Sequence, residues 1–334
     1  MNKPKTICSC IRNKKDFKEI NWTKLCDKNE SPKPGDVLLA KVVNEDGYEY
    51  LEDWNGRNVK LYKGDFIVVV LGNRFSGTNT YGKIPEQPLG KWDLIDLLAQ
   101  GGIVGKSICA GLYENAKKMC IVGFCTESDG SIYNINNHMI QLEKLDKHSK
   151  EKTQLVFVFG TSAETGKTTL TSKLINGLKN QKKLVAATKL CGTGRLKDKL
   201  SYLDAGADIS LDFVDMGIAT TYGEDEKKIR KIFEEVYNYC NAAVDYLVVE
   251  IGGDALEANA NVGVSIANEY DCLKMVCVND AMGGLMYKSI FKNAIFFSYK
   301  QNIVALKARL DVEKVYQINE DAIRMVVDEL IEEK

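Results

Sequence analysis

Residues Leu155 to Thr169 read LVFVFGTSAETGKTT and place a turn rich in glycine and threonine directly after five apolar residues. A buried strand, a glycine-bearing turn and a helix that begins near Lys167 would direct backbone N–H groups and the positive end of the helix dipole into one space. A triphosphate suits this arrangement. The pattern predicts a phosphate-binding loop formed by Gly160, Thr161, Ser162, Ala163, Glu164, Thr165, Gly166, Lys167, Thr168 and Thr169.

This loop departs in one place from the common spacing G-x-x-x-x-G-K-[ST]. Thr161 stands where the first glycine is expected, and Gly160 lies one residue earlier. In the common pattern the lysine bridges the β- and γ-phosphates and the next hydroxyl binds Mg²⁺, which assigns those roles to Lys167 and Thr168. The alternative is a strand-to-helix turn that carries Gly-Lys-Thr by coincidence. The flanking apolar run and the helical pattern favour the phosphate loop.

Length and composition restrict the class of protein. The chain has 334 residues, enough for two ordinary domains, and its 45% hydrophobic content allows sizeable cores. With 45 Lys and Arg against 46 Asp and Glu, the net charge of -1 favours neither a nucleic-acid partner nor a membrane partner. We find no apolar core of a signal peptide and no run of about 18 apolar residues. We therefore expect a cytoplasmic protein.

The sequence contains ten cysteines, which we expect to be reduced thiols because the chain is large and shows no export signal. Cys8 and Cys10 form a C-x-C pair. A metal site at this pair would need further ligands, and neither histidine stands at a recognisable spacing. Whether the pair binds a metal is left open by the sequence.

Residues 1 to 145 are predicted to form a β-rich domain, either a small barrel or a sandwich. Several short β-like runs follow turns, and Asn55-Gly56 is a hairpin-type turn between two alternating runs. A helix-like stretch is expected at Trp92–Gln100, and a further strand is expected at Ser131–Asn134. We interpret this domain as a substrate or partner module.

Two glycine-rich segments of this domain have more than one interpretation. Gly101 to Ser107 superficially resembles a phosphate loop, but we expect it to follow a helix instead of a strand and assign no phosphate binding to it. Gly72, Asn73, Arg74 and Gly101 either belong to a loop for a substrate or partner or make tight turns of the barrel.

Residues 154 to 334 are predicted to form a second domain, after a polar, lysine-rich linker at 143 to 153. Apolar runs alternate with amphipathic helical patterns throughout this part. Such alternation predicts an α/β domain with a mostly parallel sheet and helices on both faces. Ligands of these sheets bind at the carboxyl ends of the strands, so the residues that follow each strand are the candidates for function.

Two of these strand ends carry charged residues. Lys189 follows the apolar run Leu184–Thr188, and Glu250 follows Tyr246–Val249 and precedes Ile251-Gly252-Gly253. A lysine here can hold an anionic substrate or a γ-phosphate, an acid can hold Mg²⁺, and Gly252 and Gly253 let backbone approach phosphates. The alternatives are a surface lysine and a capping carboxylate.

Three segments together resemble the core of dethiobiotin synthetase and its relatives. They are Gly160–Thr168, Ala187–Lys189 and Val248–Gly253. Those relatives include the cobyrinic acid amide synthases and the protein that serves molybdopterin guanine dinucleotide synthesis. The resemblance covers residues 154 to 300 and implies a P-loop NTPase fold, ATP, Mg²⁺ and a homodimer. It implies that Lys167 and Lys189 grip phosphate and substrate, and that Thr168, Asp204 and Glu250 hold Mg²⁺.

The resemblance also has limits. Ser162 stands where the synthetase has an aspartate, and the residues that recognise its diaminoacid substrate have no clear counterparts, so biotin synthesis itself is not implied. One further group of residues has alternative interpretations, as part of a substrate surface, of a dimer surface or of an ordinary polar loop. These residues are Asp212, Asp215, Thr220, Thr221 and Tyr222. Asn279-Asp280 is only a fragment of the guanine signature N-K-x-D, which favours ATP over GTP.

The function implied is an ATP- and Mg²⁺-dependent ligase or synthetase, with Lys167, Lys189 and Glu250 as candidate catalytic residues. A carboxylate or carbamate of a small metabolite would attack the γ-phosphate, and an amine would then close the acyl phosphate to an amide or ring. A small-molecule kinase would stop at phosphoryl transfer. The hypothesis from another class is a nucleotide-dependent switch or cofactor-delivery protein, with the β-rich domain as its partner module.

Overall fold

The structure, a computed structural model, describes residues 3–18, 20, 25–26, 29–112, 115–147, 152–299 and 301–332. Its chain divides into two units. Unit 1 comprises Met1–Gln141, Thr193–Lys197 and Phe213–Glu224, and unit 2 comprises Leu142–Gly192, Asp198–Asp212 and Asp225–Lys334. Residues 193–197 and 213–224, which the sequence assigned to the second domain, thus pack within unit 1.

Unit 1 is built around five strands that close on themselves. In order they are β5 (Phe66–Leu71), β2 (Val37–Val42), β9 (Lys117–Phe124), β7 (Leu94–Ala99) and β8 (Ile103–Cys109), and β8 pairs back with β5. This closure makes a barrel, one of the two predicted alternatives, and pairs the strand edges with one another. The remaining elements are β1 (Thr6–Ile7), α1 (Lys14–Phe17), β3 (Tyr50–Glu52), β4 (Asn58–Lys60), β6 (Tyr81–Lys83) and the 3₁₀ helix Ile135–Asn137.

The predicted hairpin of unit 1 is confirmed, and two other predictions are wrong. β3 and β4 pair antiparallel around Gly56, which has φ +86°. Trp92–Gln100 contains the strand β7 and no helix, because its apolar residues pair with β8 on one side and β9 on the other. A short apolar run does not distinguish these states by periodicity alone. Ser131–Asn134 makes only isolated bridges, from Ile132 to Thr126 and from Asn134 to Asp36.

Unit 2 contains a sheet of seven parallel strands with helices between them, as predicted. Its strand order is β12-β11-β13-β10-β14-β15-β16. The strands are β10 (Gln154–Gly160), β11 (Val185–Cys191), β12 (Ile209–Asp212), β13 (Tyr246–Ile251), β14 (Cys272–Cys277), β15 (Ile295–Ser298) and β16 (Val315–Gln317). The helices are α2 (Lys167–Asn180), α3 (Leu196–Asp204), α4 (Glu226–Cys240), α5 (Ala260–Glu269), α6 (Ala281–Ile290), α7 (Ile303–Leu310) and α8 (Glu320–Glu332).

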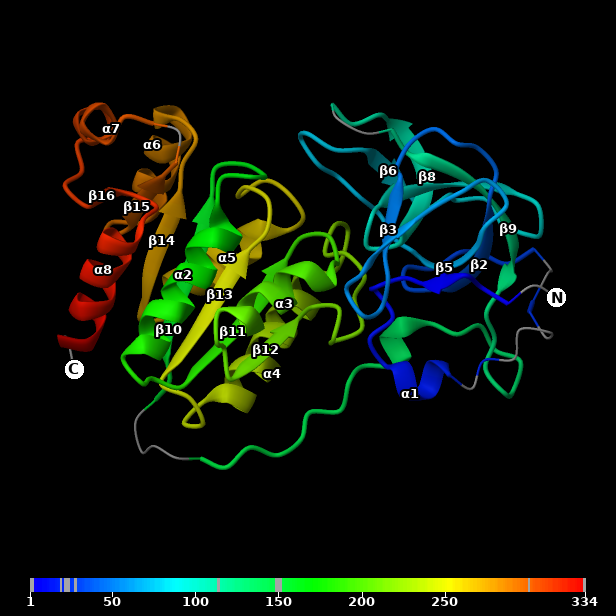
Figure 1. Ribbon diagram of the computed structural model, residues 1–334, viewed down its shortest axis with the longest axis horizontal. Helices are drawn as coiled ribbons and strands as arrows, with labels where there is room; N and C mark the ends of the chain where they lie inside the picture. The colour runs from blue at the N-terminus through cyan, green and yellow to red at the C-terminus, as the bar shows by residue number, and fades with distance from the viewer. Residues whose placement is uncertain are drawn as a thin grey trace. The chain divides into compact units, whose positions relative to one another are not determined.

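The central strand β10 is buried on both faces, which explains its unbroken apolar run. Val156 and Val158 belong to a core that includes side chains of α2 and α8, and these helices lie together over the sheet in Figure 1. Phe157 and Phe159 alternate with them and contact aromatic rings of α4 and α6. Burial on both faces fixes the register of β10 and therefore the place where the loop after Phe159 begins.

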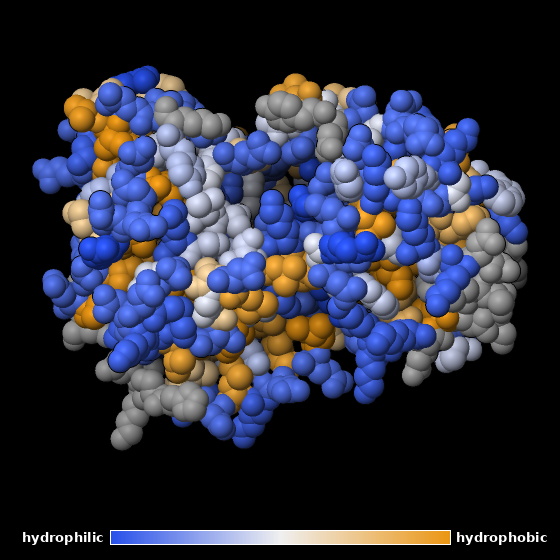
Figure 2. All heavy atoms as spheres, in the orientation of Figure 1, coloured by the Kyte–Doolittle hydropathy of each residue, from blue (hydrophilic) through white to orange (hydrophobic). Residues whose placement is uncertain are grey.

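The surface of the molecule is mixed. Figure 2 shows hydrophilic residues over most of the visible face, with smaller hydrophobic groups among them. Among the described residues, none of the helices combines the length and apolarity that a membrane span needs.

Candidate phosphate and metal site

The residues Gly160 to Thr169 connect the last residue of β10 to the first turn of α2, as the sequence predicts. Glu164 and Gly166 have φ values of +59° and +98°, and the left-handed Gly166 leads directly into the helix. A Cβ atom on Gly160 would lie 2.4 Å from Thr165 Oγ1 and 2.9 Å from Lys167 Cδ. Glycine at position 160 is therefore required for the loop to close over its own lysine.

Lys167 folds back across this loop. Its side chain is only 6% exposed, and its Nζ donates to the Ser162 carbonyl oxygen at 2.7 Å. Burial lowers the pKa of Lys167, and the nearby Glu250 acts in the opposite direction. This ammonium group lies beside the first N–H groups of a helix, which have no acceptor inside that helix. It is well placed to exchange the Ser162 carbonyl for a phosphate oxygen.

Glu250, on β13, accepts two hydrogen bonds. Thr168 Oγ1 donates to Glu250 Oε1 at 2.9 Å, and the Tyr202 hydroxyl of α3 donates to Glu250 Oε2 at 2.7 Å. The Glu250 residue is 2% exposed, and burial followed by the charge of Asp198 raises its pKa. Mg²⁺ takes oxygen ligands, and a hydroxyl and carboxylate this close together fit one such cation.

Lys189 lies inside β11, which continues past Thr188 to Cys191; the expectation that Lys189 follows the strand is therefore wrong. In the sheet register Lys189 stands between Asp212 of β12 and Glu250 of β13. Its Nζ forms an ion pair with Asp198 of α3. Burial lowers the pKa of Lys189, but Asp198 and Glu250 outweigh this effect and the pKa is raised. Lys189 is thus a charged lysine of the site and not a surface lysine.

The predicted metal ligand Asp204 is not brought to this cluster. Asp204 is exposed at the last residue of α3, six residues after Asp198. Six residues correspond to about 9 Å of helix and to a different helix face. The acid of α3 that reaches the site is Asp198, which lies less than two turns earlier in the same helix and which the sequence did not single out.

The two glycines after β13 make close backbone contacts. A Cβ atom on Gly252 would lie 2.4 Å from the Cys191 carbonyl oxygen, and the Gly252 N–H donates to that oxygen at 3.1 Å. Gly253 has φ +76°. The turn therefore requires both glycines at the carboxyl end of β13, where the backbone of β11 also ends.

Asn279 contacts the phosphate loop from the end of β14. Its backbone N–H donates to Thr161 Oγ1 and its side-chain Nδ2 donates to Ser162 Oγ, both at 3.1 Å. Asp280 caps α6 by accepting from Gly283 N at 2.9 Å. Asn279 thus fixes Thr161 and Ser162, the two loop positions that depart from common patterns. The strand-end rule could have found it.

Most of the remaining candidates make contacts inside unit 1. Asn73 Oδ1 accepts from Ile84 N at 2.8 Å, and Arg74 donates to the Tyr48 hydroxyl at 2.7 Å, which supports the interpretation as barrel turns. Asp215 pairs with Arg12, and the Tyr222 ring stacks on Phe75. Thr220 bridges Thr193, Thr221 is buried, and Asp212 ends β12 in unit 2.

Cys8 and Cys10 are buried thiols of unit 1. Hydrogen bonding to Cys8, together with burial, raises the pKa of the Cys10 thiol. Within the described part of the chain, no group of three or more His, Cys, Asp or Glu side chains is arranged to hold a metal ion. Cys8 is 0% and Cys10 1% exposed, a degree of burial typical of small core residues.

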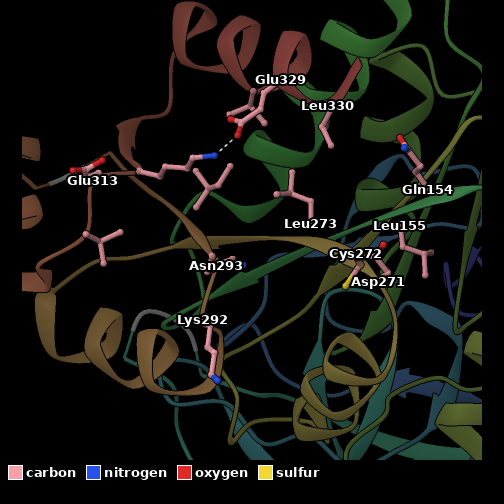
Figure 3. A pocket seen from close by; sticks show the side chains of 15 residues that line it. Gln154, Leu155, Asp271, Cys272, Leu273, Lys292, Asn293, Glu313, Glu329 and Leu330 are labelled. Carbon is pink, nitrogen blue, oxygen red and sulfur yellow. Dashed lines mark hydrogen bonds and ion pairs between the residues drawn. The ribbon is translucent and has the colours of Figure 1, made fainter. Parts of the chain in front are cut away.

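A cavity of about 520 Å³ lies at the amino ends of strands of the unit 2 sheet, the ends opposite to the phosphate loop. Figure 3 shows side chains from the amino ends of β10, β14 and β15 and from α8 around it, including Gln154, Cys272 and Leu330. Lys314 and Glu329, which form an ion pair, also line it. This cavity is separate from the phosphate loop, which stands at the carboxyl end of β10.

Sheet, loop and lysine together define unit 2 as a P-loop NTPase fold, a class of nucleotide-binding domain. No protein-family model and no curated protein sequence matches the chain.

Three solved structures illustrate the similarity of fold. The MinD cell division protein of Aquifex aeolicus has 16% identity, covers 55% of this chain and 98% of its own, and has a TM-score of 0.39. HypB from Helicobacter pylori in complex with nickel has 15% identity, coverage of 54% and 86%, and a TM-score of 0.38. A ParA family ATPase from Chlorobium tepidum TLS has 12% identity, coverage of 55% and 93%, and a TM-score of 0.33.

Proposed function

We propose that this chain binds ATP with Mg²⁺ at the phosphate loop, cleaves the γ-phosphate and uses the nucleotide state as a conformational switch. The observation that carries the proposal is the hydrogen bond from Thr168 to Glu250, formed beside the two lysines Lys167 and Lys189. Phosphoryl transfer requires a phosphate-binding loop, oxygen ligands for a metal ion and a further positive charge, which is Lys189 here.

Each residue has a role in this proposal. Backbone N–H groups of the loop and Lys167 hold the β- and γ-phosphates, and Lys189 neutralises charge on the γ-phosphate or on the group that attacks it. Thr168 and Glu250 hold Mg²⁺, which supplies further neutralisation of the phosphate oxygens. Asp198 orients Lys189 through their ion pair. Catalysis then rests on positioning and electrostatics.

The switch is supported by the path of the chain beyond the sheet. Residues 193–197, directly after β11, and residues 213–224, directly after β12, pack within unit 1. Lys189 and Asp212 therefore lie only a few residues before segments of unit 1 along the chain. A change at either residue on nucleotide binding would occur close to such a segment in sequence. Nucleotide-dependent switches act through strand-end segments of this kind.

A ligase or kinase reaction is the second candidate, and Lys189 is the observation that favours it. The three segments that resemble dethiobiotin synthetase assign this lysine to phosphate and substrate. A carboxylate or carbamate oxygen of a small metabolite would attack the γ-phosphorus and ADP would leave. An amine would then attack the acyl carbon, losing a proton and displacing phosphate. A kinase would stop after the first step.

ATP is proposed over GTP because Asn279-Asp280 is only a fragment of the guanine signature N-K-x-D. The aspartate of that fragment, Asp280, is used to cap α6. A homodimer is proposed from the family resemblance alone, and light scattering with and without nucleotide tests it.

Calorimetric titration of the full chain with ATPγS and GTPγS, in Mg²⁺ and in EDTA, tests nucleotide binding. Phosphate release measured with and without small carboxylates and amines separates the two candidates. We expect Mg²⁺-dependent binding that prefers ATPγS, with slow release that small molecules leave unchanged. Lys167→Ala should abolish turnover, and Lys173→Ala, on the same helix, is its matched control. Absence of binding to either analogue contradicts the proposal, and strong stimulation by a carboxylate supports the ligase or kinase instead.

A further inference from the structure

The cavity of about 520 Å³ at the amino ends of the unit 2 strands adjoins the core that α2 and α8 cover. Every residue that lines it belongs to unit 2. Leu273 and Leu330, two of its lining residues, pack against that core and are only partly buried. A volume of this size falls within the range of pockets that bind small molecules. The cavity is therefore large enough for a ligand of its own.

Gln154 contributes a polar atom without a partner to this cavity. It is the first residue of β10, and because side chains alternate along a strand it lies on the same sheet face as Val156. Its Oε1 atom is buried, and within the described residues no hydrogen-bond donor reaches it. A buried acceptor without a donor is rare in folded proteins, because burial removes the water that would otherwise donate to it. The cavity is the space from which such a donor can come.

The charges around the cavity favour a cation. The charged side chains that line it are three acids and two lysines, namely Asp271, Glu313, Glu329, Lys292 and Lys314. One of the lysines, Lys314, already pairs with Glu329 (Figure 3). Glu329 also belongs to the last turn of α8, and helix C-termini carry a partial negative charge. Among the described residues of α8, that turn has no basic side chain. Both features favour a positively charged ligand.

Other walls of the cavity are apolar. Leu273 of β14, Ile295 of β15 and Leu330 of α8 line it. Hydrocarbon groups of a ligand gain free energy against such side chains because they leave water. Pockets for small molecules combine an apolar lining of this kind with a few polar groups that fix the orientation of the ligand. A ligand that suits the charges, the acceptor and the apolar walls has an ammonium group at one end and a hydrocarbon group at the other.

We propose that this cavity is a second ligand site of unit 2 and that it binds small primary amines with an apolar body. The ammonium group donates to Gln154 Oε1 and lies in the negative field of Glu329 and the end of α8. The hydrocarbon part lies against Leu273 and Ile295. Because the site stands at the strand ends opposite to the phosphate loop, it goes beyond the proposed function and does not depend on nucleotide binding.

Three probes of related shape separate charge from hydrogen bonding. Phenethylammonium has a positive charge and N–H donors, trimethylphenethylammonium keeps the charge without a donor, and hydrocinnamate is an anion. Calorimetric titration of the full chain measures the affinity of each. We expect phenethylammonium to bind at least about fivefold more tightly than trimethylphenethylammonium and at least about 20-fold more tightly than hydrocinnamate. Hydrocinnamate binding as tight as that of phenethylammonium, or no binding of phenethylammonium, overturns the proposal.

Gln154→Leu removes the acceptor with little change of size. Affinity for phenethylammonium should fall about fivefold to tenfold, whereas affinity for trimethylphenethylammonium should stay within about twofold of wild type. The variant should also raise the midpoint of urea unfolding measured by circular dichroism, because apolar atoms replace a buried polar atom that lacks a donor. Gln317→Leu, at the exposed last residue of β16, should match wild type with both probes. Equal losses with both probes, no loss, or a lower midpoint in Gln154→Leu contradicts the role of Gln154 and overturns the inference.

Glu329→Gln tests the selection by charge. It removes the carboxylate that pairs with Lys314, so the cavity becomes more positive. Both cationic probes should bind about threefold to tenfold more weakly, and hydrocinnamate should bind more tightly. Asp321→Asn, in the first turn of the same helix, should leave all three affinities unchanged. If Glu329→Gln leaves the affinities of both cations unchanged, charge does not select the ligand and the proposal is wrong. These measurements use no nucleotide, so their outcome is separate from that of the proposed function.

Discussion

Two glycine-rich turns of this chain both follow a strand, yet only one of them forms a phosphate loop. The turn Gly160–Gly166 leads from β10 into α2, whereas Gly101-Gly102 leads from β7 into β8. In the second turn the backbone groups serve the barrel: Gly102 N donates to Ala99 O, and Gly102 O accepts from Val70 N, both at 2.9 Å. In the first, the N–H groups at the start of α2 have no helical acceptor. The element after the turn, more than its glycines, decides its chemistry.

The lysines of the two turns differ in the same way. Lys106 lies exposed on β8, while Lys167 begins α2 and is buried against the loop. A lysine after a glycine turn is thus a phosphate ligand only where a helix start brings it back over that turn. Four substitutions test this contrast.

Lys167→Ala should have the largest effect. The variant lacks the ammonium group that is proposed to exchange the Ser162 carbonyl for a phosphate oxygen. MgATP turnover should therefore fall at least about 100-fold. Lys106→Ala, the matched change in the other turn, should leave phosphate release unchanged. Comparable turnover in wild type and Lys167→Ala would show that the two turns do not differ in function.

Gly102→Ala should damage unit 1 without affecting the nucleotide site. Gly102 has φ +96°, and a Cβ atom there would lie 2.1 Å from the Cβ of buried Cys8. Strain and overpacking together should lower the free energy of unfolding by about 3 kcal/mol. All three tryptophans lie within residues 1–141, so their fluorescence during urea denaturation reports on unit 1. Reduced ATPγS affinity per folded molecule would contradict this separation.

The contrast also shows what sequence reasoning could and could not find. The loop at Gly160, its helix and the acid Glu250 were predictable because they are local patterns at strand ends. Gly101–Ser107 was set aside for a reason that proved wrong, since a strand precedes it. The apolar run of β7 fits a helix or a strand equally, and only pairing with β8 and β9 decides between them.

The partners of the site residues required the three-dimensional fold. Asp198 of α3 contacts Lys189 and Tyr202 of α3 contacts Glu250 through side chains of separate elements, and no local pattern encodes those contacts. Family resemblance selected Asp204 from the same helix, but helical geometry points it elsewhere.

Thr168→Val tests the metal half of the phosphate loop. Valine keeps the branched shape but removes the hydroxyl that contacts Glu250, so the advantage of Mg²⁺ over EDTA in ATPγS affinity should fall about tenfold. Thr168→Ser restores a hydroxyl and should recover most of that advantage. Titration calorimetry at several Mg²⁺ concentrations measures it, and an unchanged Mg²⁺ dependence in Thr168→Val would remove Thr168 from the metal site.

Gly64→Ala should have the smallest effect and separates the two costs in Gly102→Ala. Gly64 has the same φ of +96°, but a Cβ atom there would meet nothing within 4 Å. Only the backbone penalty of alanine in the left-handed region remains, about 1 kcal/mol. Gly77→Ala, also in open space but without a positive φ, should cost less than that. Tryptophan fluorescence in urea compares all three variants. If Gly64→Ala proves as destabilising as Gly102→Ala, backbone strain alone explains both, and the contact with Cys8 is not what fixes glycine in the second turn.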